Sequence, residues 1–231
     1  MANNPKHIAI ILDGNRRYGE KIGNRLKGHI HGLKKVEELL KWCRDLGIKE
    51  LTLYAFSTEN FNRSEKEVRY IMNLFRRYIK RLKNDKNLQK NKLKINFIGR
   101  LGLFPKDIQK EMEEVMEKTK GNDSFKVNFA MGYGGRSEII DATKRLIEDF
   151  KDNKIKIGYI NEELFSNYLY LKNDPDILIR PGGEKRISNF LLWQSSYTEL
   201  FFIDKLWPEF TKNDLVEIID EFKKRERRFG K

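Results

Sequence analysis

Residues 7–19 read His-Ile-Ala-Ile-Ile-Leu-Asp-Gly-Asn-Arg-Arg-Tyr-Gly, an apolar run that stops at a charged turn. The apolar residues 8–12 show no helical periodicity and are too few to span a membrane, so they predict a strand buried on both faces of a parallel sheet. Because ligands of open α/β sheets bind beyond the carboxyl ends of the strands, Asp13 and the arginines after it predict a phosphate site. The alternative for Asp13-Gly14 taken alone is an ordinary turn.

The composition of the chain favours an anionic partner. Among its 231 residues, 47 Lys and Arg outnumber 34 Asp and Glu, which leaves a formal net charge of +13. Such a balance suits nucleic acid, anionic lipid headgroups or phosphorylated small molecules. Cys43 is the only cysteine, so an internal disulfide is excluded and a reducing compartment is expected. The sequence has no long apolar run and no signal-peptide core at its start, and we therefore expect a cytoplasmic protein.

Short apolar runs alternate along the chain with segments whose apolar residues recur every three or four positions. The runs predict strands at residues 8–12, 51–56, 93–98, 125–131, 176–180 and 199–203. Helices are expected between them, one of which follows a Ser64-x-x-Glu67 capping box, while 84–92 is expected to be a solvated loop. No repeat or linker divides the sequence. The alternation predicts an α/β fold with a six-stranded, mostly parallel sheet in a single domain, residues 1–231.

Several common kinds of site are excluded by their motifs. Residues 23–29 have the glycine spacing of a P-loop but lack its Lys-Ser/Thr ending, and residues 132–137 lack the third glycine of a dinucleotide fingerprint. The sequence has no Cys and His cluster with metal-ligand spacing and no G-x-S-x-G turn. A nucleotide-hydrolysing P-loop, a Rossmann cofactor site and a serine-hydrolase site are therefore not predicted.

The polar residues that remain are arginines near strand ends, with a few carboxylates beside them. They are Arg17, Arg63, Arg136 and Arg180, with Arg25 and Arg186 in adjoining loops, and the carboxylates Asp13, Glu59 and Glu199. Guanidinium groups bind phosphate oxygens two at a time, and Mg²⁺ is usually held by one or two carboxylates together with substrate phosphates. The residue types thus favour a site for two diphosphates and Mg²⁺. For any single arginine, a solvated basic surface remains the alternative.

The spaced motifs resemble those of the cis-prenyltransferases, the undecaprenyl or polyprenyl diphosphate synthase family. The resemblance covers residues 7–230 and rests on HIAIILDGNRRY, LTLYAFSTENFNR, MGYGGR, DILIRPGGEKRISNFLLWQ and RERRFG, in that order. It implies a six-stranded parallel sheet surrounded by helices, a deep apolar tunnel lined by strand 125–131 and helix 68–82, and a homodimer. Because Arg16 stands where bacterial members commonly have Gly, the chain is most similar to archaeal-type members.

The resemblance also implies roles for individual residues. It makes Asp13 and Asn60 catalytic, with Asp13 acting through a metal ion, and it makes Glu199 a second metal-binding carboxylate. Since a neutral carboxamide is a poor base, we expect Asn60 to position the substrate and the released diphosphate to accept the proton. The implied substrate-binding residues are Gly14, Asn15, Arg16, Arg17, Tyr18, Arg25, His29, Ser57, Thr58, Glu59, Phe61 and Arg63, and, around isopentenyl diphosphate, Arg180, Arg186, Ile187 and Ser188.

Members of this family condense isopentenyl diphosphate onto an allylic diphosphate in the cis geometry, with Mg²⁺ as cofactor. The resemblance therefore implies a polyprenyl diphosphate synthase, with geranylgeranyl or farnesyl diphosphate as primer. Its product would be a long chain such as undecaprenyl diphosphate, the precursor of a glycosyl carrier lipid. Two other interpretations remain, namely a non-catalytic subunit of a two-chain synthase and a basic nucleic-acid-binding protein. We expect no nucleic-acid partner, and we keep a peripheral membrane contact for product release as an option.

Overall fold

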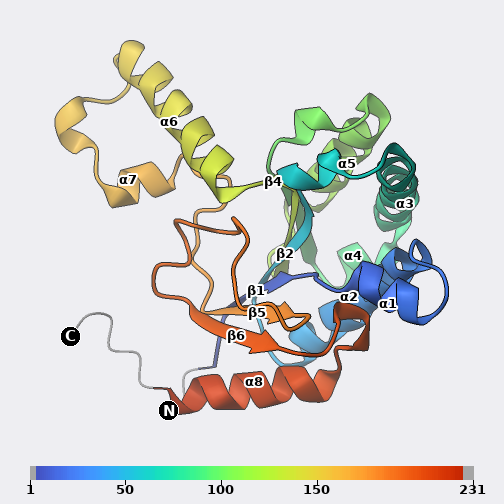
Figure 1. Ribbon diagram of the computed structural model, residues 1–231. Coiled ribbons are helices and arrows are strands. Elements are labelled where there is room, and N and C mark those ends of the chain that lie inside the picture. The colour runs from blue at the N-terminus through green and yellow to red at the C-terminus, as the bar shows by residue number, and fades with distance from the viewer. Residues whose placement is uncertain (1–3, 226–231) are drawn as a thin grey trace.

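Six parallel strands form one sheet in the computed structural model, which describes residues 4–225 (Figure 1). The strands are β1 (His7–Ile11), β2 (Glu50–Ser57), β3 (Leu93–Ile98), β4 (Phe125–Tyr133), β5 (Ile177–Pro181) and β6 (Glu199–Ile203). Their order across the sheet is β3-β4-β2-β1-β5-β6, and every neighbouring pair runs parallel. The predicted six-stranded sheet is confirmed, and it is parallel throughout. β1 lies between two strands and is buried along its whole length, as its unbroken apolar run predicted.

Helices connect the successive strands except β5 and β6, which are joined by the loop 182–198, and one helix follows β6. They are α1 (Asn15–Lys21), α2 (Lys27–Asp45), α3 (Glu65–Asn84), α4 (Lys86–Lys90), α5 (Lys106–Thr119), α6 (Gly135–Lys151), α7 (Glu162–Ser166) and α8 (Lys212–Lys224). Short 3₁₀ turns lie at η1 (Thr58–Asn62), η2 (Leu101–Leu103), η3 (Ile157–Tyr159) and η4 (Trp207–Glu209). None of the helices within the described range is long and apolar enough to cross a membrane.

The two faces of the sheet are covered unequally. Because successive residues of a strand point to opposite faces, Ile8 and Ile10 join the main core whereas Ala9 belongs to a smaller cluster on the other side. The apolar faces of α2, α3, α5 and α8 pack into the main core. The smaller cluster is closed by loop residues, among them Phe190 and Leu191. The sheet is therefore a two-layer scaffold over most of its area, with helices on one face and loops on the other.

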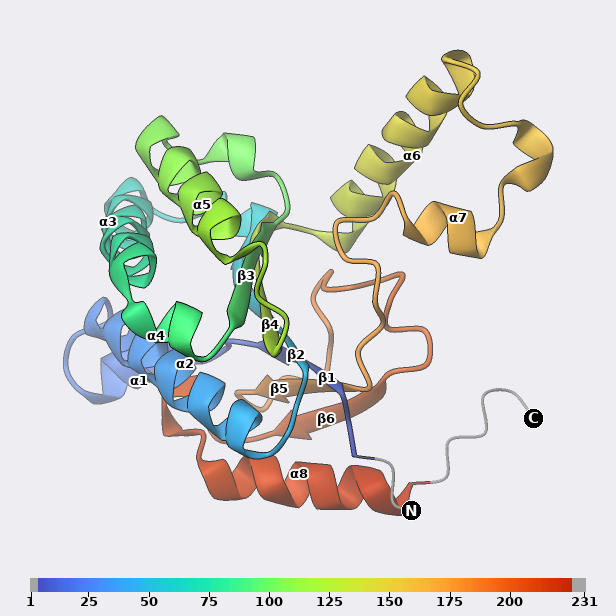
Figure 2. The same cartoon turned by 180° about the vertical axis from the view of Figure 1, so that it is seen from behind.

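Helices α6 and α7 project away from the sheet and form an arm, residues 135–168, that both ribbon views show (Figures 1 and 2). Much of the exposed apolar surface of the described chain lies on this arm. The residues concerned are Ile140, Ile147, Phe150, Ile157, Tyr159 and Ile160. A monomer rarely exposes a large contiguous apolar patch, so the arm has the character of an interaction surface.

Three local predictions were wrong. The residues after Asp13-Gly14, expected to form a turn, continue as α1, and the expected loop 84–92 contains α4. The capping box at α3 does not form, because the Ser64 side chain makes no cap hydrogen bond and the Glu67 carboxylate pairs with Arg63 and contacts His29 instead. The RERRFG motif lies, beyond its first arginine, outside the described residues.

Candidate active site

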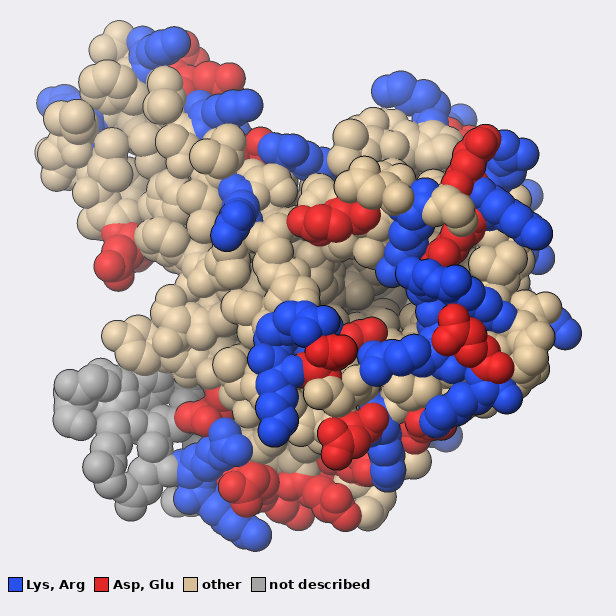
Figure 3. All heavy atoms as spheres, viewed as in Figure 1, with Lys and Arg blue, Asp and Glu red and all other residues tan. Residues whose placement is uncertain are grey.

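A cavity of about 800 Å³ opens at the carboxyl edge of the sheet, beside the ends of β1, β2 and β5. Helices α1, α2 and α3 and the loop 182–189 supply the rest of its wall. On the molecular surface, a hollow of uncharged atoms is rimmed by Lys and Arg side chains with Asp and Glu between them (Figure 3). The parallel sheet thus brings the polar strand ends together at one edge, as the sequence predicted.

Asp13 follows β1 directly and occupies the centre of the charged wall. The backbone N–H of Trp207 donates to the Asp13 carbonyl oxygen at 2.8 Å. Gly14 takes a left-handed conformation, φ 104°, and packs so closely on η4 that a Cβ would not fit. The Asp13 carboxylate pairs with Arg17 at 3.2 Å and, through its other oxygen, with Arg180 at 2.9 Å. Backbone packing therefore sets the position of Asp13, and two guanidiniums orient its side chain.

Arg180 lies near the end of β5 and is buried. Besides pairing with Asp13, its guanidinium donates to Ser188 Oγ at 2.6 Å and to the Arg186 carbonyl oxygen. Arg17 donates to the Gly182 carbonyl oxygen at 2.7 Å, so a second guanidinium ties down the same loop. One buried arginine thus holds both the carboxylate at the end of β1 and the loop that carries Ser188.

A second charged cluster surrounds Glu67 on the first turn of α3. A single oxygen of its carboxylate lies 3.1 Å from Arg63 Nη1, 3.4 Å from His29 Nε2 and 3.7 Å from Arg16 Nε. Burial lowers the pKa of His29. The neighbouring Arg63 and Arg16 lower this pKa further, and Glu67 offsets the decrease only in part. Arg16, His29 and Arg63 all line the cavity, whereas Glu67 lies behind them with its side chain 7% exposed.

The last residue of β2 and the turn after it supply Ser57, Glu59 and Asn60. The Asn60 side-chain oxygen accepts the Ser57 backbone N–H at 3.1 Å, which closes the 3₁₀ turn η1. Glu59 accepts a hydrogen bond from Asn189 at 3.2 Å and thereby links this turn to the loop after β5. Burial alone would raise the pKa of Glu59, but hydrogen bonds from its own backbone, from Ser57 and from Asn189 hold that pKa below its usual value.

The inner wall of the cavity is apolar. It is formed by Leu33 and Val36 from α2, Phe56 from β2, and Ile71, Leu74 and Phe75 from α3. The predicted tunnel wall is thus present on α3. It is absent on β4, whose Phe125 does not line the cavity but is buried in the main core, because helices α3 and α5 pack over that strand.

Most of the residues that the sequence singled out meet at this cavity. Those that line it are Asp13, Gly14, Asn15, Arg16, Arg17, Arg25, His29, Ser57, Glu59, Asn60, Arg63, Arg180, Arg186 and Ser188. Six others do not line it. Tyr18 packs against His31, Phe61 packs in an aromatic cluster with Phe56, and Ile187 packs against the smaller core cluster; Thr58, like Arg136, is also absent from the lining.

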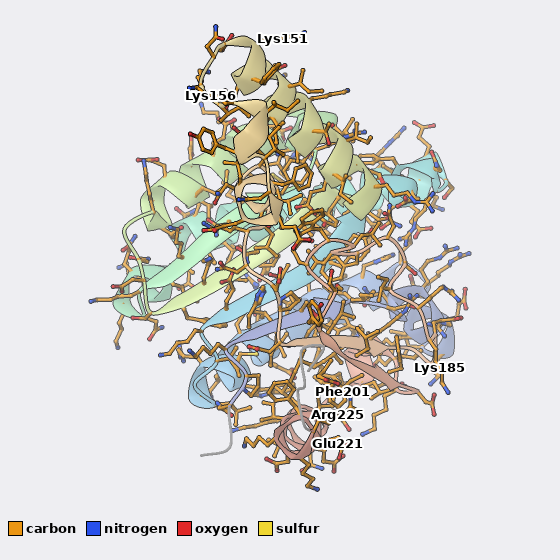
Figure 4. All side chains as sticks on the ribbon, turned by 90° about the vertical axis from the view of Figure 1, so that its left-hand side faces the viewer. Lys151, Lys156, Lys185, Phe201, Glu221 and Arg225 are labelled. Carbon is orange, nitrogen blue, oxygen red and sulfur yellow. The ribbon has the colours of Figure 1, made fainter. Side chains whose placement is uncertain are left out.

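Glu199 is the sixth, and the structure separates it from Asp13. It begins β6 and is level with Ile177 and Ile8, at the amino edge of the sheet. From Ile8 to Ile11, where β1 ends just before Asp13, the strand advances roughly 10 Å. Glu199 pairs instead with Arg225 at 2.7 Å, and Figure 4 shows Arg225 beside Phe201 and Glu221 near the end of α8. Within one chain, the structure thus places Glu199 outside the cavity that Asp13 lines.

The cavity wall also contains residues that the sequence did not indicate. They are chiefly Glu20, Gly32, Leu33, Val36, Tyr54, Glu184 and Asn189, with Glu67 behind the wall. Leu33 and Val36 lie on the helical stripe that continues into the core, so periodicity gave no sign that their side chains face a cavity. Glu67 carried a clear pattern, the capping box, that indicated a different role.

The donor set at Asp13 fits a magnesium ion only together with a ligand. Within residues 4–225, no group of three or more His, Cys, Asp and Glu side chains is arranged to hold a metal. Asp13 is a single carboxylate among guanidiniums, which matches the usual magnesium site of one or two carboxylates completed by substrate phosphates. Asp13 is therefore the residue that would hold Mg²⁺ here.

The full length of the chain matches known proteins. The family model described as putative undecaprenyl diphosphate synthase matches residues 11–230. The chain belongs to this family. It is 51% identical to the geranylgeranyl-diphosphate-specific tritrans,polycis-undecaprenyl-diphosphate synthase of Pyrococcus abyssi, with 98% of this chain and 87% of the relative covered. The synthase of the same name from Methanocaldococcus jannaschii is 47% identical over 99% of this chain and 84% of that relative.

Solved structures agree with this membership of the undecaprenyl diphosphate synthase family. Lavandulyl diphosphate synthase from Lavandula x intermedia, solved with dimethylallyl diphosphate, superposes with a TM-score of 0.93 at 31% identity over 99% of both chains. A probable undecaprenyl diphosphate synthase from Campylobacter jejuni gives a TM-score of 0.83 at 38% identity, with 99% of this chain and all of that chain covered. The predicted family, its archaeal-type character and the enzyme class, a transferase, are confirmed.

Proposed function

We propose that this chain extends geranylgeranyl diphosphate with isopentenyl diphosphate in the cis geometry to give undecaprenyl diphosphate, a precursor of glycosyl carrier lipid. One observation carries the proposal. A single cavity joins a wall of arginines around Asp13 to an inner wall of Ile71, Leu74 and Phe75. A diphosphate needs the first wall and a growing prenyl chain needs the second. The names of the relatives in Pyrococcus and Methanocaldococcus favour geranylgeranyl over farnesyl diphosphate as primer.

Two diphosphate subsites follow from the two charged clusters. The allylic diphosphate would lie against Arg16, His29 and Arg63, with Gly14, Asn15, Arg17 and Arg25 around it, because this cluster borders the apolar wall. Isopentenyl diphosphate would lie against Arg180, Arg186 and Ser188. Asp13 stands between the two subsites and would hold Mg²⁺ together with the phosphates. When bound, the ion would stabilise the negative charge that develops on the leaving diphosphate.

The residues of the chain can carry the condensation through three steps. The arginines of the allylic subsite stabilise the departing diphosphate while an allylic cation forms at C1. The double bond of isopentenyl diphosphate then attacks C1, which forms the new carbon–carbon bond and leaves a tertiary cation. Loss of a C2 proton to the released diphosphate restores a double bond. Asn60 positions the substrate and does not accept the proton, because its carboxamide is a poor base and its oxygen already accepts the Ser57 N–H.

The apolar wall protects the reaction and receives the product. By excluding water, Val36, Phe56 and Phe75 keep the allylic cation from hydrolysis. With each condensation the prenyl chain lengthens along this wall, and helix α3 must move outward to admit a longer chain because the core behind Phe75 is packed.

The proposal is tested by incubating the purified protein with labelled isopentenyl diphosphate and either geranylgeranyl or farnesyl diphosphate. We expect elongation by the chain alone, with kcat/KM roughly tenfold higher for the geranylgeranyl primer. Chelation of Mg²⁺ should abolish turnover and its return should restore it. Failure of every primer would favour a non-catalytic subunit, and saturable binding of random DNA with a steep salt dependence would favour a nucleic-acid-binding protein.

A homodimer would account for the exposed arm. Ile147, Phe150, Ile157 and Tyr159 expose apolar surface that a second copy could cover. Such a partner could also bring a second carboxylate, Glu199, to a site that has only Asp13 within one chain. Sedimentation of the full chain at micromolar concentration would give the oligomeric state. A cytoplasmic location with a peripheral membrane contact for product release remains part of the proposal.

A further inference from the structure

The carboxylate of Glu67 has no part in the reaction as proposed above, yet it lies behind three cavity-lining donors. Arg16 comes from α1, His29 from α2 and Arg63 from the turn that enters α3, and all three point at one Glu67 oxygen. The Glu67 side chain is 7% exposed. A carboxylate is rarely buried to this extent unless cations surround it, so Glu67 and its three neighbours act as one electrostatic unit.

The distances within this cluster indicate charge balance rather than rigid positioning. Only Arg63 makes a hydrogen bond to Glu67, at 3.1 Å. Arg16 Nε and His29 Nε2 lie at 3.7 and 3.4 Å, and both atoms are buried without any hydrogen-bond partner in the described structure. A contact of that length attracts a charge but does not fix its geometry. The two donors are therefore free to turn to a closer anion.

We propose that Glu67 is an internal counter-anion that shares Arg16, His29 and Arg63 with the bound diphosphate and so limits how tightly that diphosphate is held. This inference rests on the proposed function, in which the three donors form the allylic subsite. In the empty protein, Glu67 offsets the mutual repulsion of the two guanidiniums. When a diphosphate binds, it competes with Glu67 for the same donors, so part of the binding free energy is lost to that competition.

The competition between Glu67 and diphosphate matters because the condensation is repeated. After each step, the released diphosphate must leave the allylic subsite before the lengthened chain can occupy it. Two guanidiniums and an imidazole N–H without a counter-anion would hold a free diphosphate strongly, because its charge would be the only negative charge in contact with them. A fixed carboxylate in contact with the same donors weakens that hold. Glu67 therefore favours release of diphosphate between condensations.

The substitution Glu67→Gln tests the inference, because it removes the charge and keeps the shape and the acceptor for Arg63. Isothermal calorimetry with inorganic diphosphate measures the subsite without any chemistry. We expect E67Q to bind inorganic diphosphate about tenfold more tightly than the wild type. We also expect the empty variant to melt at a lower temperature and to gain more from added diphosphate than the wild type gains.

Two matched variants complete the test. Glu65→Gln removes a carboxylate from the same helical turn. The Glu65 side chain is 85% exposed and pairs with Arg69, away from the cavity. The E65Q variant should therefore bind diphosphate as tightly as the wild type. Glu67→Asp retains the charge and should bind diphosphate at least about fivefold more weakly than E67Q.

Turnover provides an independent readout. If release of diphosphate becomes slow, E67Q should show a lower steady-state kcat and stronger inhibition by inorganic diphosphate, while its single-turnover rate changes little. Equal or weaker binding of diphosphate by E67Q would overturn the counter-anion role. Absence of diphosphate binding by the wild type would instead overturn the proposed function, and the inference with it.

Discussion

The two edges of the sheet both bury charged groups, but they differ in whether these groups have hydrogen-bond partners. At the amino edge, Glu50 accepts hydrogen bonds from Lys126, Asn128 and Asn173, all between 2.8 and 3.0 Å. Asn128 also donates to Thr52. Burial alone would raise the pKa of Glu50, but the neighbouring His7 and these hydrogen bonds hold that pKa below its usual value.

At the carboxyl edge, several buried polar atoms lack hydrogen-bond partners. Among the described residues they include Asn15 Oδ1, Arg16 Nε, His29 Nε2 and Arg180 Nε, all from residues that line the cavity. No side-chain atom of the network at the amino edge is in this condition. Since an unpaired buried polar group costs free energy, the carboxyl edge is poised for a ligand and the amino edge is complete without one. Along the same strands, the amino edge therefore contributes to stability and the carboxyl edge to function.

The largest effect is expected from Asp13→Asn, which changes the carboxyl edge. The substitution removes the charge but keeps the shape, and Asn also suits a turn. Loss of one strong electrostatic contact costs roughly 3–4 kcal/mol in the transition state, so elongation should slow at least about a hundredfold in a variant that still folds. Steady-state kinetics at saturating Mg²⁺ give the measurement. Asp107→Asn, which removes a carboxylate from a surface pair with Arg76, is the control.

Turnover of Asp13→Asn within a few-fold of the wild type would remove Asp13 from the chemistry. It would also remove the contrast between the edges, because Asp13 would then be only a turn residue.

A smaller effect, of the opposite kind, is expected from Glu50→Gln at the amino edge. Gln offers one acceptor where Glu50 receives four hydrogen bonds, so Lys126 and one or more amides lose their partner. The free energy of unfolding should fall by roughly 2–3 kcal/mol, which is the loss expected when a partly exposed ion pair loses its negative partner. Urea unfolding measures the loss, and kcat should stay within about twofold of the wild type. A large drop in kcat at unchanged stability would contradict the separation.

The smallest effect concerns the pH dependence of stability. Burial lowers the pKa of His7 below its usual 6.5, and Glu50 offsets this only in part. Above pH 6.5 His7 is neutral in both states; as the pH falls below 6.5, the unfolded chain takes up the proton first, so stability is lost. The free energy of unfolding should decline by about 1.4 kcal/mol per pH unit from this residue until the folded pKa is reached.

His7→Asn should remove that part of the decline, which urea unfolding between pH 7.5 and 5.0 would measure. His29, whose pKa is also lowered, should still contribute in the variant. An unchanged slope in His7→Asn would show that the amino edge does not keep His7 neutral.

Local sequence patterns were enough to predict the elements and one edge of the sheet. The apolar run at 8–12 indicated a buried strand because a strand enclosed on both faces has no polar side. Once the alternation of strands and helices implied a parallel sheet, the carboxyl ends of the strands had to lie together. Asp13, Arg63 and Arg180 could therefore be assigned to one site without knowledge of the strand order.

The sequence by itself determined the strands, the longer helices and the charged residues at the strand ends, because these depend on neighbours within a few positions. Only the tertiary structure decided which side chains meet across the sheet. It placed Glu199 at the amino edge, since β6 starts level with Ile8, and it turned Glu67 from a cap toward His29. Both outcomes depend on strand register and helix packing between segments far apart in the chain, and no local pattern records these.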